Sequence, residues 1–306
     1  MKRRTFLKTS GTAAAYGLLG GYELSSVFPR AKLTRLTILH TNDLHSRIHP
    51  FADDAGERAG RGGFTRVASI IDKIRSSVSH SLLLDCGDVL QGTPYFNLFD
   101  GELEFKLMSK MGYDAGTIGN HEFDAGIEKL ADNFRHLNFP FLNSNYDFSN
   151  TPLSGKVKEN LILNRGGIKI GIFGLGIELF GLVPEKLFGN VIYHDPIPVA
   201  RRMASFLKNE ENCDLVICLS HLGYQYQSSK VSDVVIASES ENIDIILGGH
   251  THTFMDAAKT VANRNGEAVV INQAGRSGKM LGKIDLVFEK NRKGKCISCK
   301  NIPITA

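Results

Sequence analysis

The sequence predicts an α/β fold in which a sheet is flanked by helices. Short β-rich apolar runs recur between Leu36 and Phe288, and several of the stretches between them carry apolar residues at helical spacing. The chain has 306 residues with 42% hydrophobic content, enough to bury a sizeable core. We expect one domain over residues 36–306, with no internal linker.

The predicted strands are short runs rich in aliphatic and β-branched residues. They are residues 36–39, 82–84, 115–118, 168–173, 215–219, 243–247, 269–271 and 284–288. The predicted helices have apolar residues three and four positions apart. They are residues 64–74, 102–111, 127–136 and 199–208.

The net charge of +4 comes from the amino-terminal segment. Seven of the 36 basic residues and one of the 32 acidic residues precede Leu36, which leaves 29 basic and 31 acidic residues and a net charge of −2 after that point. A basic surface for nucleic acid is therefore not indicated, and we expect no nucleic-acid partner.

Residues 1–35 read as an export signal and leader. Arg3 and Arg4 precede a small, mildly apolar run from Gly11 to Gly21, and the segment resembles a twin-arginine export signal. An ordinary basic leader for the general secretory route is the alternative. The apolar run is short and rich in Gly and Ala, so no stable membrane span is expected. Both alternatives predict a periplasmic or otherwise extracytoplasmic protein.

Polar side chains that suit metals or proton transfer follow five of the predicted strands. In open α/β sheets such groups gather at the carboxyl ends of the strands. The segments are Thr41 to His45, Asp85 to Asp88, Gly119 to Glu122, Ser220 to His221, and Gly248 to His252. One such segment alone occurs often in surface loops by chance, but five in this order are much more specific.

The spacing within these segments favours metal binding. Asp43 and His45 are two residues apart, so on an extended segment both side chains point the same way and can hold one ion. His250 and His252 repeat that spacing, and Asp88 has two carboxylate oxygens with which it could bridge two ions. Asn120 and His221 add an amide oxygen and an imidazole. This mixture suits a borderline divalent metal better than calcium.

Taken together, the motifs resemble the full signature of the calcineurin-like metallophosphoesterases. The matching residues are Asp43-x-His45, Gly87-Asp88, Gly119-Asn120-His121-Glu122, His221 and Gly249-His250-x-His252. Within that superfamily, the segments 40–45, 87–94, 119–124 and 248–253 are similar to the 5'-nucleotidase branch. The resemblance implies a four-layer α/β/β/α sandwich with the metal site at the carboxyl ends of the strands.

The resemblance also implies two metal sites that share one ligand. One divalent ion would be held by Asp43, His45, Asp88 and His252, and a second by Asp88, Asn120, His221 and His250. Nothing in the donor set decides between Mn, Zn, Fe and Co.

His121 and Asp124 take the catalytic roles that the resemblance implies. The two metals would bind a phosphoryl oxygen and activate a water. His121 would assist the leaving group or stabilise the transition state, and Asp124 would orient its imidazole. His40, at the end of the first strand, is expected to be a hydrogen-bonded core residue and not a ligand.

The expected function is hydrolysis of phosphate monoesters, with 5'-nucleotides or related nucleotides as substrates. Members of the 5'-nucleotidase family carry a second, nucleoside-binding domain, which is absent from residues 36–306. A separately encoded recognition domain is therefore a possible partner. One alternative is a phosphodiesterase, a cyclic-nucleotide hydrolase or another ester hydrolase with the same metals. The other is a non-catalytic module that binds phosphorylated ligands, against which the intact His121 and Asp124 count.

Overall fold

The computed structural model describes residues 33–289 and 294–305. The predicted export signal lies almost wholly outside them. From Leu33 onward the chain forms one compact unit. Among the helices of the described residues, none is both long enough and apolar enough to cross a membrane.

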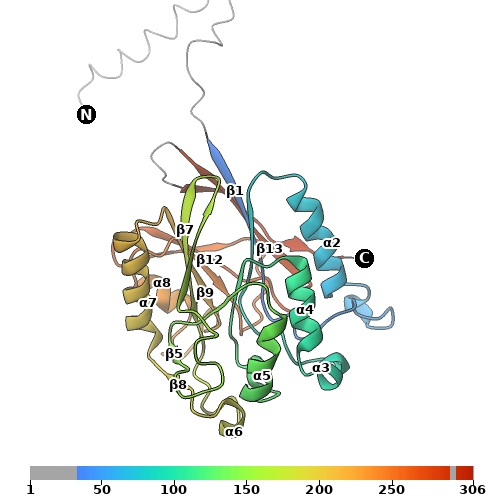
Figure 1. The fold of residues 1–306 in the computed structure, drawn as a ribbon. Coiled ribbons are helices and arrows are strands. Elements are labelled where there is room, and N and C mark those ends of the chain that lie inside the picture. Colours follow the sequence, from blue (N-terminus) through green and yellow to red (C-terminus); the bar gives the residue numbers. More distant parts are fainter. Residues whose placement is uncertain (1–32, 290–293, 306) are drawn as a thin grey trace, which may run out of the picture. The chain divides into compact units, whose positions relative to one another are not determined.

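Two large sheets form the centre of this unit (Figure 1). The first has the strand order β14-β13-β1-β2-β3-β4, and β15 pairs with β13. Its strands are β1 (Thr34–Thr41), β2 (Ser81–Asp85), β3 (Ala115–Thr117), β4 (Phe141–Leu142), β13 (Met280–Phe288), β14 (Gly294–Cys299) and β15 (Ile302–Pro303).

The second sheet has the order β11-β12-β10-β9-β7-β6. Its strands are β6 (Asn160–Arg165), β7 (Ile168–Leu175), β9 (Leu215–Ser220), β10 (Ile245–Gly248), β11 (Lys259–Ala262) and β12 (Ala268–Asn272). A small separate sheet pairs β5 (Tyr146–Asp147) with β8 (Ile192–Tyr193).

The centre of each large sheet is parallel. In the first sheet β1, β2, β3 and β4 run in one direction, and in the second β7, β9, β10 and β12 do so. Antiparallel strands lie outside these parallel sets, for example β13 beside β1 and β6 beside β7. The carboxyl ends of each parallel set therefore lie along one edge of its sheet.

Seven α-helices belong to the described residues. They are α2 (Phe64–Arg75), α3 (Pro94–Phe99), α4 (Glu102–Met111), α5 (Ile127–Asn133), α6 (Glu185–Phe188), α7 (Pro196–Ser205) and α8 (Asp233–Glu239). Short 3₁₀ turns occur at Gly56–Arg58, His121–Phe123 and Phe134–His136, and a π-helical turn extends α7 over Phe206–Glu210.

Successive side chains along each strand point to opposite faces of its sheet, and this alternation produces four layers. On β1, Leu36 and Ile38 pack between the two sheets, whereas Leu39 packs on the opposite face with residues of α2 and α4. On β7, Ile172 faces the first sheet and Phe173 packs against α7 and α8. Figure 1 shows the two groups of helices on opposite sides of the sheets. The predicted α/β/β/α sandwich is confirmed.

Each of the eight predicted strands is present, as β1, β2, β3, β7, β9, β10, β12 and β13. The four predicted helices correspond to α2, α4, α5 and α7. Helix α5 ends three residues earlier than predicted, where a 3₁₀ turn follows it, and α7 begins and ends three residues earlier than predicted, with a π-helical turn after it. His40 is fully buried and its Nε2 receives a hydrogen bond from Asn272 Nδ2 at 2.8 Å, which confirms its predicted place in the core.

Candidate metal centre and active site

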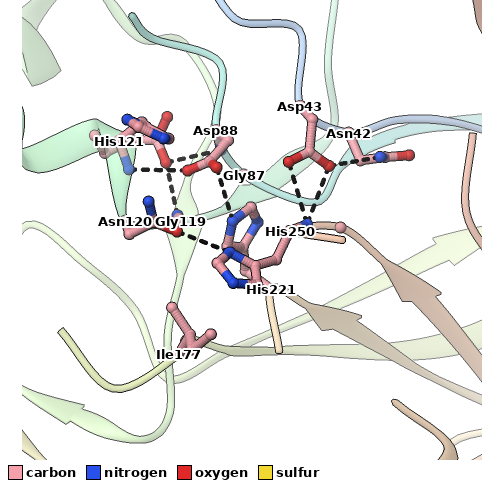
Figure 2. Close-up of polar contacts among 12 residues, drawn as sticks. Asn42, Asp43, Gly87, Asp88, Gly119, Asn120, His121, Ile177, His221 and His250 are labelled. Carbon is pink, nitrogen blue, oxygen red and sulfur yellow. Dashed lines mark hydrogen bonds and ion pairs between the residues drawn. The ribbon is translucent and has the colours of Figure 1, made fainter. Parts of the chain in front are cut away.

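The candidate ligands follow the carboxyl ends of five strands drawn from both sheets. They are Asp43 and His45 after β1, Asp88 after β2, Asn120 after β3, His221 after β9, and His250 and His252 after β10. All seven side chains come together, and Figure 2 shows the part of this group around Asp88 and His221.

The backbone at these positions is unusual. Asp43, His45, Asp88, His250 and His252 have φ values of 50°, 49°, 57°, 70° and 52°. Few residues other than glycine adopt this left-handed region, although Asn, Asp and His do so more often than most, and each such residue costs on the order of 1 kcal/mol. Five of the seven candidate ligands thus sit in strained loops, a feature that clusters at functional sites.

The first group of ligand atoms comes from Asp43, His45, Asp88 and His252, and these atoms all lie within 4.8 Å of one another. Nε2 of His45 is 2.9 Å from Nε2 of His252. Oδ1 of Asp43 is 3.2 Å from Nε2 of His252 and 3.9 Å from Nε2 of His45. Imidazole nitrogens and a carboxylate that converge on one point form a suitable shell for a divalent cation.

The second group consists of Asp88, His221 and His250, with ligand atoms within the same 4.8 Å limit. Oδ2 of Asp88 is 3.0 Å from Nε2 of His221. The amide oxygen of Asn120 joins this group, 3.0 Å from Nδ1 of His250. Asp88 belongs to both groups, so its carboxylate lies between them.

His221 is held in the tautomer that a metal ligand needs. Its ring is fully buried, and Nδ1 donates a hydrogen bond to the carbonyl oxygen of Cys86 at 2.6 Å. Nε2 is 3.0 Å from Oδ2 of Asp88, but it has no hydrogen-bond partner of suitable geometry among the described residues. A buried nitrogen in this position fits a metal ion, because a second-sphere carbonyl on the opposite nitrogen orients such a ligand.

Gly119 keeps the space between the two groups open. A Cβ on Gly119 would lie 2.3 Å from Oδ1 of Asp88 and 2.8 Å from Nε2 of His221, so any larger residue there would fill the region between these donors. A Cβ on Gly249 would lie 2.9 Å from both Nδ1 of His221 and the carbonyl oxygen of Cys86, so it would disturb the hydrogen bond that orients the His221 ring. Both the donor set and the free space fit two divalent ions.

His121 and Asp124 form a pair beside the first group. Nδ1 of His121 is 2.7 Å from Oδ2 of Asp124, and the His121 ring centroid is 5.2 Å from that of His45. Burial alone would lower the pKa of His121, but its hydrogen bond to Asp124 and the charge of Asp88 outweigh burial and raise the pKa to about 9. A protonated imidazole here can act as an acid.

Two supporting residues were not predicted to have a role. The carboxylate of Glu122 accepts hydrogen bonds from backbone N–H groups of the loop that carries Asp88. The Asn42 amide donates to Oδ2 of Asp43 at 2.6 Å and accepts from the backbone N–H of Ala274 at 2.8 Å. Both residues lie inside the motifs, but a sequence does not reveal which backbone groups a side chain will meet.

Comparison with known proteins gives matches along most of the chain. Residues 36–254 match a family model described as calcineurin-like phosphoesterase. The trifunctional nucleotide phosphoesterase protein YfkN of Bacillus subtilis (strain 168) is 32% identical over 296 residues, which cover 86% of this chain and 19% of that protein. The 5'-nucleotidase of Bos taurus is 32% identical over 299 residues, which cover 91% of this chain and 50% of that protein.

A solved structure agrees with these matches. A 5'-nucleotidase precursor from Thermus thermophilus has a TM-score of 0.79 and 28% sequence identity, over 89% of this chain and 55% of that one. The chain thus spans about half of that structure and of the Bos taurus protein, and less of the Bacillus subtilis protein. From the family model and the identity to these relatives, the chain belongs to the calcineurin-like phosphoesterase family.

Proposed function

We propose that this chain is a phosphoesterase with a binuclear metal centre that hydrolyses phosphate monoesters, chiefly 5'-nucleotides or related nucleotides. The observation that carries the proposal is the position of Asp88 between two groups of ligand atoms, with the His121–Asp124 pair beside them. The nucleotide part rests on the relatives, which are named as nucleotide phosphoesterases and 5'-nucleotidases.

The proposed ligand sets are Asp43, His45, Asp88 and His252 for one ion and Asp88, Asn120, His221 and His250 for the other. Two bound divalent ions supply Lewis-acid chemistry, since they polarise a phosphoryl group and lower the pKa of an attacking water. Mn, Zn, Fe and Co all suit this donor set. Elemental analysis of the native protein identifies the ions.

His121 and Asp124 would complete the site. Because Asp124 engages Nδ1 of His121, the opposite nitrogen is left to face the substrate. A proton held there can be given to the leaving-group oxygen as its bond to phosphorus breaks. Asp124 favours the protonated imidazole and fixes its orientation. A binding module would have no use for such a pair, which favours catalysis over mere ligand binding.

Turnover of a panel of phosphate esters by metal-loaded protein tests the proposal. The panel contains nitrophenyl phosphate, 5'-nucleotides, 2',3'-cyclic nucleotides and bis(nitrophenyl) phosphate. Preferential hydrolysis of the monoesters is the expected result. Preference for the diesters would support the phosphodiesterase alternative, and binding without turnover of any ester would support a non-catalytic module.

We also propose that the protein is exported. The leader residues Arg3 and Arg4 support this proposal. Export that stops when both are changed to Lys would indicate the twin-arginine route.

A further inference from the structure

Five cations gather beside the first ligand group. They are Arg47, Arg58, Arg61, Arg276 and Lys279, and together they are called the cation cluster. Among the residues that the structure describes, none of the five forms an ion pair with an acidic side chain. The positive charge of the cluster is therefore not neutralised by ion pairs, and such a concentration of charge attracts anions.

Backbone hydrogen bonds join the segments that carry the cluster. The N–H of Phe64 donates to the carbonyl of Arg47 at 2.8 Å, and the N–H of Phe51 donates to the carbonyl of Arg61 at 3.0 Å. The N–H of Gly63 donates to the carbonyl of Ser277 at 3.1 Å. The cluster is therefore built on linked loops, and its charges are brought together by the fold.

Aromatic rings, in place of carboxylates, support the cationic side chains. The guanidinium carbon of Arg47 lies 4.2 Å from the centroid of Phe51, and that of Arg58 lies 5.1 Å from the same ring. Nζ of Lys279 lies 4.5 Å from the centroid of Phe254. Such contacts hold a cation in place without neutralising it, so its N–H donors stay available to an anion.

Two of these donors are already buried. Nε of Arg47 and Nε of Arg61 are out of contact with solvent and have no hydrogen-bond partner among the described residues. Arg58 and Arg276 are close enough to Arg47 to repel its positive charge. Burial and the charges of Arg276, Arg61 and Arg58 lower the pKa of Lys279. An anion bound among these groups would supply the missing partners and relieve the repulsion.

The cluster adjoins the ligands of the first group. Nη1 of Arg276 is 3.4 Å from Nδ1 of His252, and the N–H of Ser277 donates to the carbonyl oxygen of Asp43 at 2.7 Å. Arg47 follows His45 by two residues. An anionic group attached to a phosphate bound at the first group would therefore reach the cluster.

Arg47 also lines a cavity of about 390 Å³ together with His49, Thr93, Tyr95 and Leu98. The rings of His49 and Tyr95 lie 5.8 Å apart, centroid to centroid. One guanidinium thus adjoins both the cluster and a partly aromatic cavity. A ligand with a second phosphate and an organic group would match both features.

We propose that the cation cluster binds a second phosphate group of the substrate, so that the chain favours organic diphosphates, such as nucleoside 5'-diphosphates, over monophosphates. This inference rests on the proposed function. In the reaction, water attacks the terminal phosphorus and the bond from that phosphorus to the bridging oxygen breaks. Inorganic phosphate and the organic monophosphate leave, and the proton from water passes to solvent. The cluster would stabilise the charge that develops on the departing monophosphate.

The test compares adenosine diphosphate with adenosine monophosphate in the Arg58→Ala protein. Arg58 is exposed and its guanidinium lies over the Phe51 ring, so its loss should spare the fold. The ratio of kcat/KM for the diphosphate to that for the monophosphate should fall roughly tenfold or more, the scale of one charge-assisted hydrogen bond. Lys73→Ala removes the same charge from the exposed face of α2 and should leave the ratio as in the wild type.

Calorimetric titration with inorganic pyrophosphate gives a readout that does not depend on turnover. In Arg58→Ala protein, Kd for pyrophosphate should rise about tenfold more than Kd for inorganic phosphate. An unchanged ratio of kcat/KM values together with an unchanged Kd for pyrophosphate overturns the inference. That outcome is expected if the cluster binds an acidic protein and not a phosphate of the substrate. Failure to hydrolyse any ester would overturn the proposed function instead, since the pyrophosphate titration can still succeed.

Discussion

The carboxylate of Glu122 accepts a hydrogen bond from the backbone N–H of Asp88 at 2.9 Å. The same oxygen accepts from the N–H of Gly119 at 2.6 Å, and the other oxygen accepts from the N–H groups of Val89 and Leu90 at 2.8 and 3.3 Å. One fully buried carboxylate thus ties the loop after β2 to the loop after β3, where Asp88 and Asn120 lie. These hydrogen bonds hold Asp88, the proposed shared ligand, in its left-handed backbone conformation.

Glu122→Gln is expected to weaken both the fold and the metal centre. An amide N–H₂ in place of one oxygen would face N–H donors, which costs about 1 to 3 kcal/mol for the unsatisfied groups. Substitution of a residue that supports a metal ligand typically lowers metal affinity by roughly 10- to 100-fold. Urea unfolding and metal titration measure the two effects. Glu128→Gln, on the exposed side of α5, is the control and should change neither.

The sequence was sufficient to predict which candidate ligands the fold brings together, but not the residues that support them. Asp43, Asp88 and His221 follow apolar runs, and parallel strands bring such positions to one edge. The roles of Asn42 and Glu122 depend on the positions of individual backbone N–H groups, which periodicity does not give. The cation cluster was missed for a related reason. Its members come from residues 47–61 and 276–279, which only the folded chain brings together.

Helix α8 was also missed, because its residues favour another structure. Its sequence, Asp-Val-Val-Ile-Ala-Ser-Glu, contains three consecutive β-branched residues, which are more typical of strands. The local cap and tertiary contacts make it helical. Ser232 caps its amino terminus, and Asp233 accepts hydrogen bonds from Ser220 and Gln273 at 2.5 and 3.0 Å.

Asp88→Asn is expected to reduce metal occupancy in both sites, whereas His45→Ala should reduce it mainly in one. The reason is that the Asp88 carboxylate lies in both ligand groups and His45 lies only in the first. Metal content per chain, measured after dialysis against a fixed free-metal concentration, distinguishes the two variants. Full occupancy of both sites together with near-normal turnover in the Asp88→Asn protein would show that Asp88 is not a shared ligand.

Asp233 should make the metal-free fold less stable as the pH rises. Burial raises the pKa of Asp233 from its usual value near 3.8 to about 7. A folded-state pKa above the unfolded value means that the stabilisation is complete below pH 4 and is lost as the pH rises through about 7. Asp233→Asn can keep both hydrogen bonds, because its Oδ1 can accept from Gln273 and its Nδ2 can donate to Ser220.

The measurement is urea unfolding of wild-type and Asp233→Asn protein at pH 5 and pH 8, with a chelator in all samples so that metal binding does not contribute. Between pH 5 and pH 8 the free energy of unfolding of the wild type should fall by a few kcal/mol relative to that of the variant. The scale follows because each unit of pKa shift corresponds to about 1.4 kcal/mol. A stability difference that is the same at both pH values would mean that Asp233 does not titrate in this range.

His121→Ala is expected to keep its metals but to lose roughly 10²- to 10⁴-fold in turnover of alkyl phosphates, the usual scale of general acid catalysis. His121 lies beside the ligand groups, and Asp124 holds Nδ1 at 2.7 Å. If His121 protonates the leaving group, the loss should shrink for nitrophenyl phosphate, because nitrophenolate leaves without a proton. Steady-state kinetics with both esters measures the difference.

Asp124→Asn should cause a smaller loss in turnover than His121→Ala, and this loss should also shrink for nitrophenyl phosphate. The reason is that an amide can still orient the His121 imidazole but no longer favours its protonated form. His194→Ala, which removes an exposed imidazole from outside the ligand groups, is the matched control and should leave turnover of both esters near the wild-type value. An equal loss for good and poor leaving groups in the His121→Ala protein would assign a different role to His121. Its imidazole would then stabilise negative charge on the phosphoryl oxygens in the transition state, where the nature of the leaving group matters little.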